Sequence, residues 1–223
     1  MLDRTTHKGR ILAAALACAA KKSWGDVTLL DIADEADLPL LALRGQFNTK
    51  EAIVAGLLRE IDDEVLKRAP KRSEGQSSRD ALFDVLMTRF DVLAPYKAAL
   101  KSIYAGGSAD LGLAGPFLSS MHWMLQAAGI GTDGATGALR VAGLGLAYAS
   151  VFRVWLDDDD PGLAKTMAAL DRRLRRGEST LGGIEQIHTA VSRFGEALQE
   201  LARNATRGRS KPSQSSGPEA GQV

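Results

Sequence analysis

Residues 27–51 constrain the fold of this chain more than any other part, because they read as two short helices separated by a tight break. Thr28 is a good N-cap, with an acid following in the first turn, so a helix should begin there and run to Ala36. Pro39 suits the first turn of a second short helix, 40–45, since its missing N–H would have no helical partner there. Two short helices joined by a tight turn form a helix-turn-helix, whose second helix is offered to the DNA major groove.

A longer third helix should follow at residues 50–69, capped by Asn48 or Thr49. Its apolar side is expected to carry Ile53, Leu57, Ile61 and Leu66. Its polar side is expected to carry Arg59, Glu60, Asp62 and Asp63. Residues 70–78 are polar and rich in serine, which predicts a hinge loop.

Residues 10–51 resemble, without a gap, the N-terminal DNA-binding domain of the TetR family of transcriptional regulators. The resemblance rests on Arg10, Ile11, Leu12, Ala14, Ala15, Leu16, Trp24, Val27, Thr28, Asp31, Ile32, Ala33, Glu35, Ala36, Leu43, Phe47, Lys50 and Glu51. It implies an all-α homodimer in which a small N-terminal domain reads an operator and a variable helical C-terminal domain holds an inducer.

The second helix departs from the family pattern where DNA contact would be made. The family usually has Gly at Asp37, Ser at Pro39, Lys at Leu40, Gly or a polar residue at Leu41, Thr at Ala42 and Tyr at Arg44. Leu and Ala offer no hydrogen bonds to base edges and at best touch a thymine methyl group. The candidate DNA-binding residues are Thr28, Pro39, Leu40, Arg44, Gln46, Thr49 and Lys50.

Charge does not favour nucleic acid as a partner of the whole chain, because 28 basic residues face 27 acidic ones and the net charge is +1. Non-specific DNA affinity comes mostly from neutralising phosphates, so a charge-balanced domain needs its basic residues on one face. A cluster of Arg4, His7, Lys8 and Arg10 begins the first helix. It fits such a face and, equally, a solvated helix end.

From residue 79 onward the pattern predicts only helices. They cover residues 81–92, a short helix from Pro95 to Gly106–Gly107, and residues 111–128, 135–156, 162–176 and 184–202. The predicted fold is all-α: an N-terminal three-helix domain at 1–50, a helical bundle for ligand binding and dimerisation at 51–202, and a disordered tail at 203–223.

The helix at residues 135–156 is apolar almost all round, so it must be covered on several sides by a partner chain, a ligand or both. Pairing it with the helix at 184–202 in a homodimer would make a four-helix bundle. The candidate ligand-binding residues are Phe117, Met121, Trp123, Met124, Val151, Phe152 and Trp155.

Several other features have a plain structural interpretation. The four aspartates at 157–160 lack the alternating spacing of a calcium loop and predict a solvated turn with an N-cap. The arginines at 172, 173, 175 and 176 suit the negative end of a helix dipole, with a membrane or nucleic-acid patch as the alternative. Cys18 reads as a small buried hydrophobe.

No enzyme class is indicated, because the histidines at 7, 122 and 188 are scattered and no nucleophile motif or Gly-rich loop is present. His122 reads as a packed or ligand-facing side chain rather than a general base. Neither a cofactor nor a metal is expected. No signal peptide is apparent and no stretch reads as a membrane span, which predicts a cytoplasmic protein.

Residues 121–176 also resemble the C-terminal domain of the lipid-binding accessory protein of ubiquinone biosynthesis, which has a TetR-like fold. This second resemblance rests on Trp123, Gly129, Arg153, Trp155, Leu156, Asp159, Asp160, Pro161, Thr166, Leu170 and Arg173. It implies a helix-turn-helix kept as a scaffold and an apolar cavity for a lipid or isoprenoid. Two hypotheses follow: a ligand-responsive DNA-binding regulator, most simply a repressor, or a lipid-binding accessory protein that does not read an operator.

Overall fold

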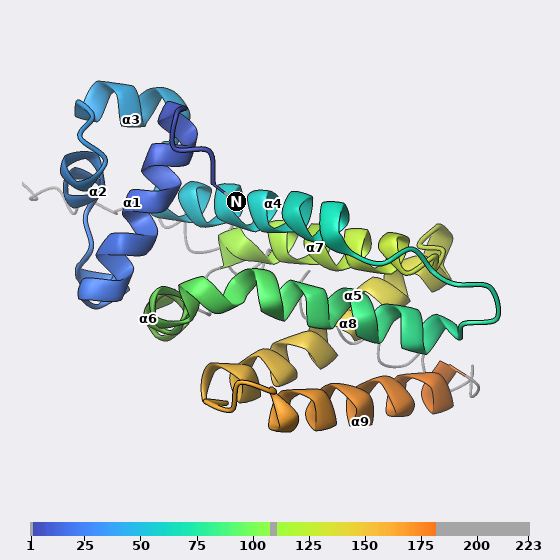
Figure 1. Ribbon diagram of the computed structural model, residues 1–223. Helices are drawn as coiled ribbons and strands as arrows, with labels where there is room; N and C mark the ends of the chain where they lie inside the picture. The colour runs from blue at the N-terminus through green and yellow to red at the C-terminus, as the bar shows by residue number, and fades with distance from the viewer. Residues whose placement is uncertain (1, 108–110, 182–223) are drawn as a thin grey trace, which may run out of the picture. The chain divides into compact units, whose positions relative to one another are not determined.

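Helices make up every regular element in the part of the chain that the computed structural model describes, residues 2–107 and 111–181 (Figure 1). The chain divides into two units, 1–178 and 179–223, and the packing below is that of the first. The helices are α1 (His7–Lys21), η1 (Trp24–Asp26), α2 (Leu29–Glu35), α3 (Leu40–Gln46), α4 (Lys50–Arg68), α5 (Ser78–Leu93), η2 (Ala94–Tyr96), α6 (Lys97–Gly107), η3 (Leu111–Leu113), α7 (Ala114–Ala127), α8 (Gly134–Leu156) and α9 (Ala164–Leu181). The predicted helix 184–202, the tail 203–223 and His188 lie outside the described residues.

Polar caps set the start of the N-terminal helices. The Thr28 hydroxyl accepts a hydrogen bond from the Asp31 N–H while the Asp31 carboxylate accepts one from the Thr28 N–H, which is the reciprocal capping box. Thr49, rather than Asn48, caps α4 by accepting from the Ala52 N–H. Pro39 was predicted in the first turn of α3. It is instead the extended N-cap, one position before the helix begins.

The N-terminal head, α1 to α3, contributes buried side chains to a hydrophobic core that continues into the body. Ile11, Leu12 and Ile32 are fully buried, and Trp24 anchors the turn after α1. Its backbone N–H donates to the Ser102 hydroxyl on α6 at 2.9 Å. Cys18 is buried as predicted. Burial raises the pKa of its thiol, which lowers the fraction present as the reactive thiolate.

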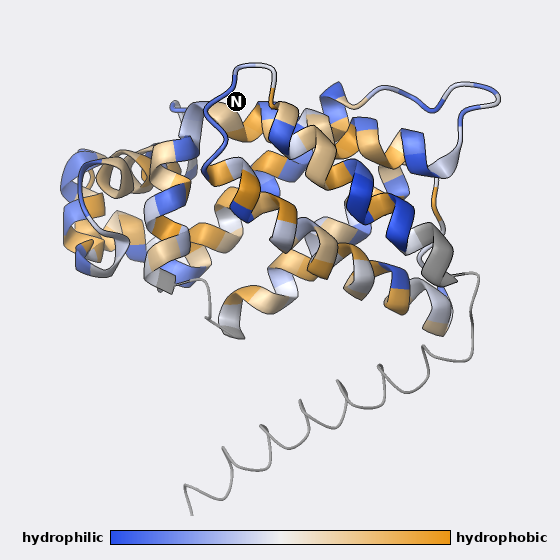
Figure 2. Ribbon diagram, turned by 90° about the horizontal axis from the view of Figure 1, so that it is seen from below, coloured by the Kyte–Doolittle hydropathy of each residue, from blue (hydrophilic) through white to orange (hydrophobic). Residues whose placement is uncertain are grey.

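The long helix α4 joins the head to the body formed by α5 to α8. At Gly56 a Cβ atom would stand 2.7 Å from the ring of Phe47, so only glycine lets α4 pack this closely on the residue that ends α3. The polar loop between α4 and α5 lies at the end of α4 that is away from the head (Figure 2). Two predicted positions on α4 are wrong: Asp62 is buried and Leu66 is exposed.

Helix α8 is packed along one face and open along the other. Its Leu144, Tyr148, Val151 and Trp155 side chains are buried, whereas Leu146 is 75% exposed. Its 23 residues are long and apolar enough to cross a membrane by length and composition alone, so the expectation that no such stretch exists is wrong. A core helix of a helical body passes the same test, and a third of the apolar window is buried here.

The aspartate run forms the capping loop before α9, as predicted, but it is only partly solvated. Asp158 is buried, and its carboxylate accepts hydrogen bonds from the Thr166 N–H at 2.9 Å and the Thr166 hydroxyl at 2.7 Å. The Asp160 carboxylate accepts from the N–H groups of Gly162 and Ala164. The described residues contain no group of three His, Cys, Asp or Glu side chains able to hold a metal ion.

Candidate nucleic-acid interface and buried polar network

The turn between α2 and α3 is held from α1. Asp37 takes a left-handed conformation with φ of 50°, a region that glycine adopts freely and that aspartate tolerates better than most residues. The Arg10 guanidinium donates to the carbonyls of Ala36 at 2.6 Å and Asp37 at 2.7 Å. This tie from Arg10 explains how the turn forms without the glycine that the TetR resemblance leads one to expect.

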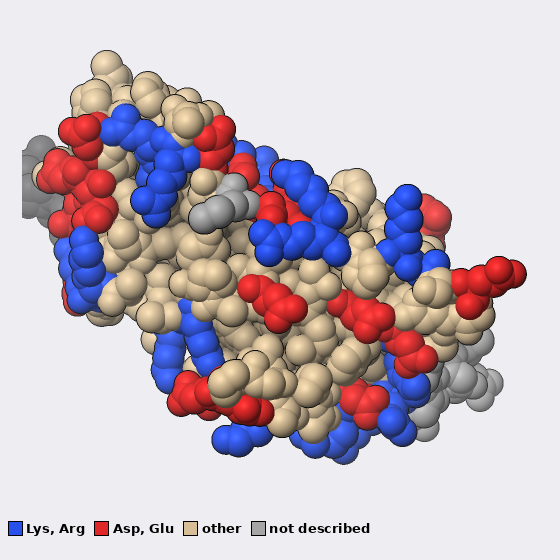
Figure 3. Space-filling model, in the orientation of Figure 1, with Lys and Arg blue, Asp and Glu red and all other residues tan. Residues whose placement is uncertain are grey.

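Helix α3 is anchored by one side chain and presents the others outward. Leu43 is 1% exposed, whereas Leu40 is 48% and Leu41 is 78% exposed. Arg44 and Gln46, near the end of the helix, are also exposed. The surface over α3 is therefore largely uncharged (Figure 3), and its hydrogen-bonding groups are confined to the C-terminal turn.

The charged groups around this surface are mostly paired within the protein. Lys22 lies 2.7 Å from the Asp31 carboxylate and Lys21 lies 2.6 Å from Glu35. The hydrogen bond from Lys22, followed by those from Thr28, lowers the pKa of Asp31 well below its usual range. In the N-terminal basic cluster, Lys8 pairs with Glu60 and Arg10 holds the turn, which leaves Arg4 and His7 as its exposed members.

The predicted DNA-binding residues fall into three groups. Pro39, Leu40, Arg44 and Gln46 share the outward surface of α3, and Thr28 and Thr49 mark the exposed starts of α2 and α4. Lys50 points inward instead. Its ammonium group donates to the carbonyls of Trp24 at 2.6 Å and Val27 at 2.7 Å, and lies 4.9 Å from the centre of the Trp24 ring. This geometry does not support a direct contact of Lys50 with DNA.

The predicted ligand-binding residues lie mostly in a packed core. Met121, Met124, Val151 and Trp155 are fully buried. Phe117 and Phe152 are half-buried beside them, both in ring contact with Tyr148. Trp123 differs, because it is 47% exposed and stands edge-on to His122. Trp123 is therefore separated from the other six.

Two surface hollows lie elsewhere, on either side of the N-terminal segment, with volumes of about 290 and 250 Å³. The first is lined by α1 and α6 and the second by α4 and α5, and they share Leu2, Arg4, Pro95 and Tyr96. None of the predicted ligand-binding residues lines either hollow.

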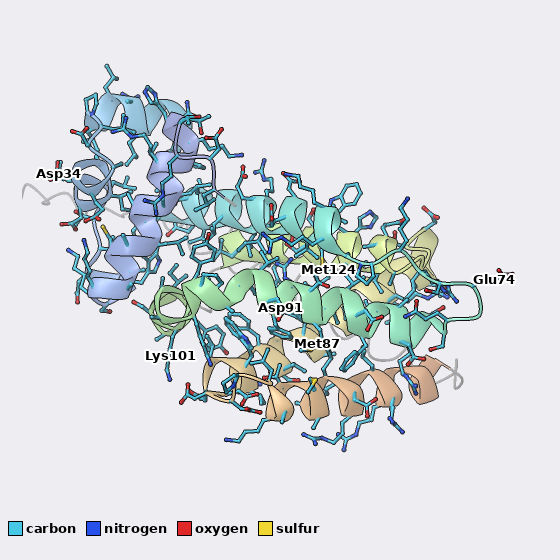
Figure 4. The ribbon with its side chains drawn as sticks, viewed as in Figure 1. Asp34, Glu74, Met87, Asp91, Lys101 and Met124 are labelled. Carbon is cyan, nitrogen blue, oxygen red and sulfur yellow. The ribbon has the colours of Figure 1, made fainter. Side chains whose placement is uncertain are left out.

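A buried polar network at the centre of the body was not predicted. The Arg89 guanidinium on α5 is fully buried and donates to the carboxylate of Asp62 on α4 and, at 3.2 Å, to the hydroxyl of Tyr148 on α8. The Ser120 hydroxyl on α7 donates to the other Asp62 oxygen at 2.6 Å. Four helices therefore meet at one ion pair. Met124, which is labelled in Figure 4, lies beside it.

Burial affects the protonation of this network. It opposes the charge on Arg89, but the neighbouring Tyr148 and Asp62 outweigh it and raise the pKa of the guanidinium above its ordinary value. Burial also raises the pKa of Tyr148, so its hydroxyl stays neutral. The sequence does carry a signal, since Arg89 occupies a core position among the apolar residues of α5.

A helix-turn-helix head joined by one long helix to a helical body defines the class of the fold, which is TetR-like. Solved structures of this class are similar to the chain. A TetR transcriptional regulator from Nitrosomonas europaea matches with a TM-score of 0.60 and 21% identity, over 77% of this chain and 97% of the other. One from Rhodococcus sp. RHA1 matches with a TM-score of 0.60 and 20% identity, over 76% of this chain and 93% of the other.

A TetR-family regulator from Streptomyces coelicolor matches over more of the chain, 90% of it and 97% of the other, with a TM-score of 0.55 and 16% identity. No protein-family model and no curated protein sequence matches. The chain therefore has the TetR-like fold, and the predicted fold class is confirmed.

Proposed function

We propose that this protein is a TetR-like transcriptional repressor, a cytoplasmic homodimer that binds operator DNA through α3 and loses that affinity when an apolar ligand binds the body. The observation that carries the proposal is the outward presentation of α3, in which Leu43 alone is buried while Leu40 and Leu41 protrude. A helix held in this way at the tip of a small domain is suited to enter a major groove.

The contacts divide by chemistry. Arg44 and Gln46 supply hydrogen bonds to base edges or phosphates, and Leu40, next to Pro39, packs on thymine methyl groups. The exposed starts of α2 and α4, at Thr28 and Thr49, direct backbone N–H groups to phosphates. Lys50 makes no contact with DNA and instead stabilises the segment that leads into α2.

Dimerisation uses the open face of α8. Leu146 stands out from this face, and the residues around it are mostly small, such as Ala142, Gly143 and Ala149. Small residues allow a second helix to approach closely, and the exposed leucine then becomes buried. Two heads on one dimer would read two half-sites about one DNA turn apart.

Fluorescence polarisation with the DNA upstream of the protein's own gene tests the proposal at moderate salt. Saturable, sequence-selective binding is expected, with Arg44→Ala and Gln46→Ala each weakening it by about 1–3 kcal/mol. Arg59→Ala, which removes an exposed arginine on α4, serves as the matched control and should leave binding unchanged. If the protein binds DNA only non-selectively, with an affinity that disappears with added salt, operator recognition is refuted.

A second function, lipid binding without operator recognition, is favoured by one observation. The protruding residues of α3 are leucines, and acidic residues of α2 and the following turn, Asp34, Glu35 and Asp37, lie exposed beside them. Such a surface is poorly matched to phosphates. Native mass spectrometry of the purified protein distinguishes the two functions, because a lipid-binding accessory protein should carry a co-purified lipid and should not select an operator.

A further inference from the structure

Arg89 is the one cation that is fully enclosed among the residues whose burial is described. Besides Asp62, its neighbours include the ring of Tyr148, whose centre lies 5.5 Å from the guanidinium, and the sulfur of Met124 at 3.9 Å. A buried Arg–Asp pair contributes little net stability, and an apolar pair of the same volume often does as well. Stability alone therefore gives no reason for this charge to be in the core.

The members of the network come from different helices, and Asp62 alone comes from α4. Through α4, whose Gly56 packs on Phe47, Asp62 is also connected to the head. The ion pair between Asp62 and Arg89 therefore fastens α4 to α5. A group that replaced Asp62 as the counter-ion of Arg89 would release this fastening.

We propose that Arg89 is the binding site for the anionic group of the effector, and that Asp62 fills this site as an internal counter-ion when no effector is bound. The inference rests on the proposed function and adds the chemical class of the ligand, a carboxylate with an apolar body. The carboxylate takes the hydrogen bonds of Arg89 and Ser120 that Asp62 accepts in this structure. Its apolar part packs among the aromatic side chains that surround Tyr148.

Ligand binding and the release of α4 then occur together, because the ligand carboxylate replaces Asp62 as the counter-ion of Arg89. Arg89 and Asp62 are both buried in this structure, so the carboxylate gains access only when Asp62 moves away with α4. A neutral molecule of the same shape cannot replace a counter-ion. The site should consequently prefer a carboxylate to the matching alcohol by about tenfold or more, the usual contribution of a hydrogen bond to a charged partner.

Calorimetric titration of the full-length protein with decanoate and with decanol tests the preference without any DNA. Asp62→Asn removes the competing charge and is expected to tighten decanoate binding by about tenfold while leaving decanol unchanged. The same variant leaves Arg89 buried without a counter-ion, so its melting temperature should fall and should be restored by decanoate but not by decanol. Asp91→Asn, an exposed aspartate on the same helix as Arg89, is the matched control and should change neither quantity.

The double variant Asp62→Leu/Arg89→Met keeps the volume of the network without its charges. It should fold, because neither charge is left alone, and it should lose the preference for decanoate. Equal binding of decanoate and decanol by the unmodified protein, or an Asp62→Asn variant with an unchanged ratio, would overturn the inference. Because these measurements involve no DNA, a failure of operator binding with the decanoate preference intact would refute the proposed function alone.

Discussion

Lys50 offers the sharpest test of how the head is built, because its position next to the helix-turn-helix also fits a DNA contact. Its ammonium group donates to the carbonyls of Trp24 and Val27 at 2.6 and 2.7 Å and stands over the Trp24 ring. Substitution by methionine keeps most of the apolar stem and removes the charge. We therefore expect Lys50→Met to lower stability and to leave DNA contact unaffected.

The size of the effect follows from these contacts. A hydrogen bond to a charged group contributes about 1.5–3 kcal/mol and a cation–π contact about 0.5–2 kcal/mol. Lys50 is half-buried, and water can replace part of what is lost, so we expect a loss of about 2–3 kcal/mol in the free energy of unfolding. For a chain of this length, that corresponds to a fall in melting temperature of roughly 5–10 °C.

Urea unfolding followed by tryptophan fluorescence measures this loss, with Lys8→Met as the control. Lys8 also loses one ion pair, with Glu60 at 2.6 Å, but both side chains are partly exposed, so the cost should stay below about 1 kcal/mol. A Lys50→Met variant within about 0.5 kcal/mol of the unmodified protein would refute the structural role, since this is the usual range of surface substitutions. A folded Lys50→Met variant with greatly weakened DNA affinity would restore Lys50 as a phosphate contact.

Three further predictions concern the turns and the helix cap of the head. Asp37→Gly should stabilise the protein by about 0.5–1 kcal/mol in thermal unfolding, because glycine adopts the left-handed conformation without strain; a loss of stability would show that the aspartate side chain matters more. The lowered pKa of Asp31, due to Lys22 and then Thr28, gives stability that is present above about pH 4 and lost as the pH falls further, so Asp31→Asn should flatten the pH profile of urea unfolding between about pH 5 and pH 2. Ser102→Ala should cost about 1 kcal/mol, since it removes the partner of a backbone N–H group in the turn after α1, and an unchanged urea midpoint would contradict this.

The sequence predicted the helices well because their signals are local. The cap at Thr28, the break before Pro39 and the polar loop before α5 each act on neighbouring residues, and the observed ends of α2 to α5 lie within a few positions of those expected. Contacts across the chain were harder to predict. Asp62 was placed on the polar side of α4, because nothing near it reveals that Arg89, 27 residues later, supplies a buried counter-ion.

In the head, the residues that make α3 fold differ from those that would contact a partner. Formation of α3 depends on Leu43 in the core and on the Arg10 contacts to the turn, whereas Leu40 and Leu41 contribute little to packing. Substitutions at the two exposed leucines therefore change what α3 binds without changing the fold. Leu41→Ala should leave stability within about 0.5 kcal/mol. If the same variant weakens operator binding, the leucine reads thymine methyl groups directly; if it does not, Arg44 and Gln46 carry the recognition.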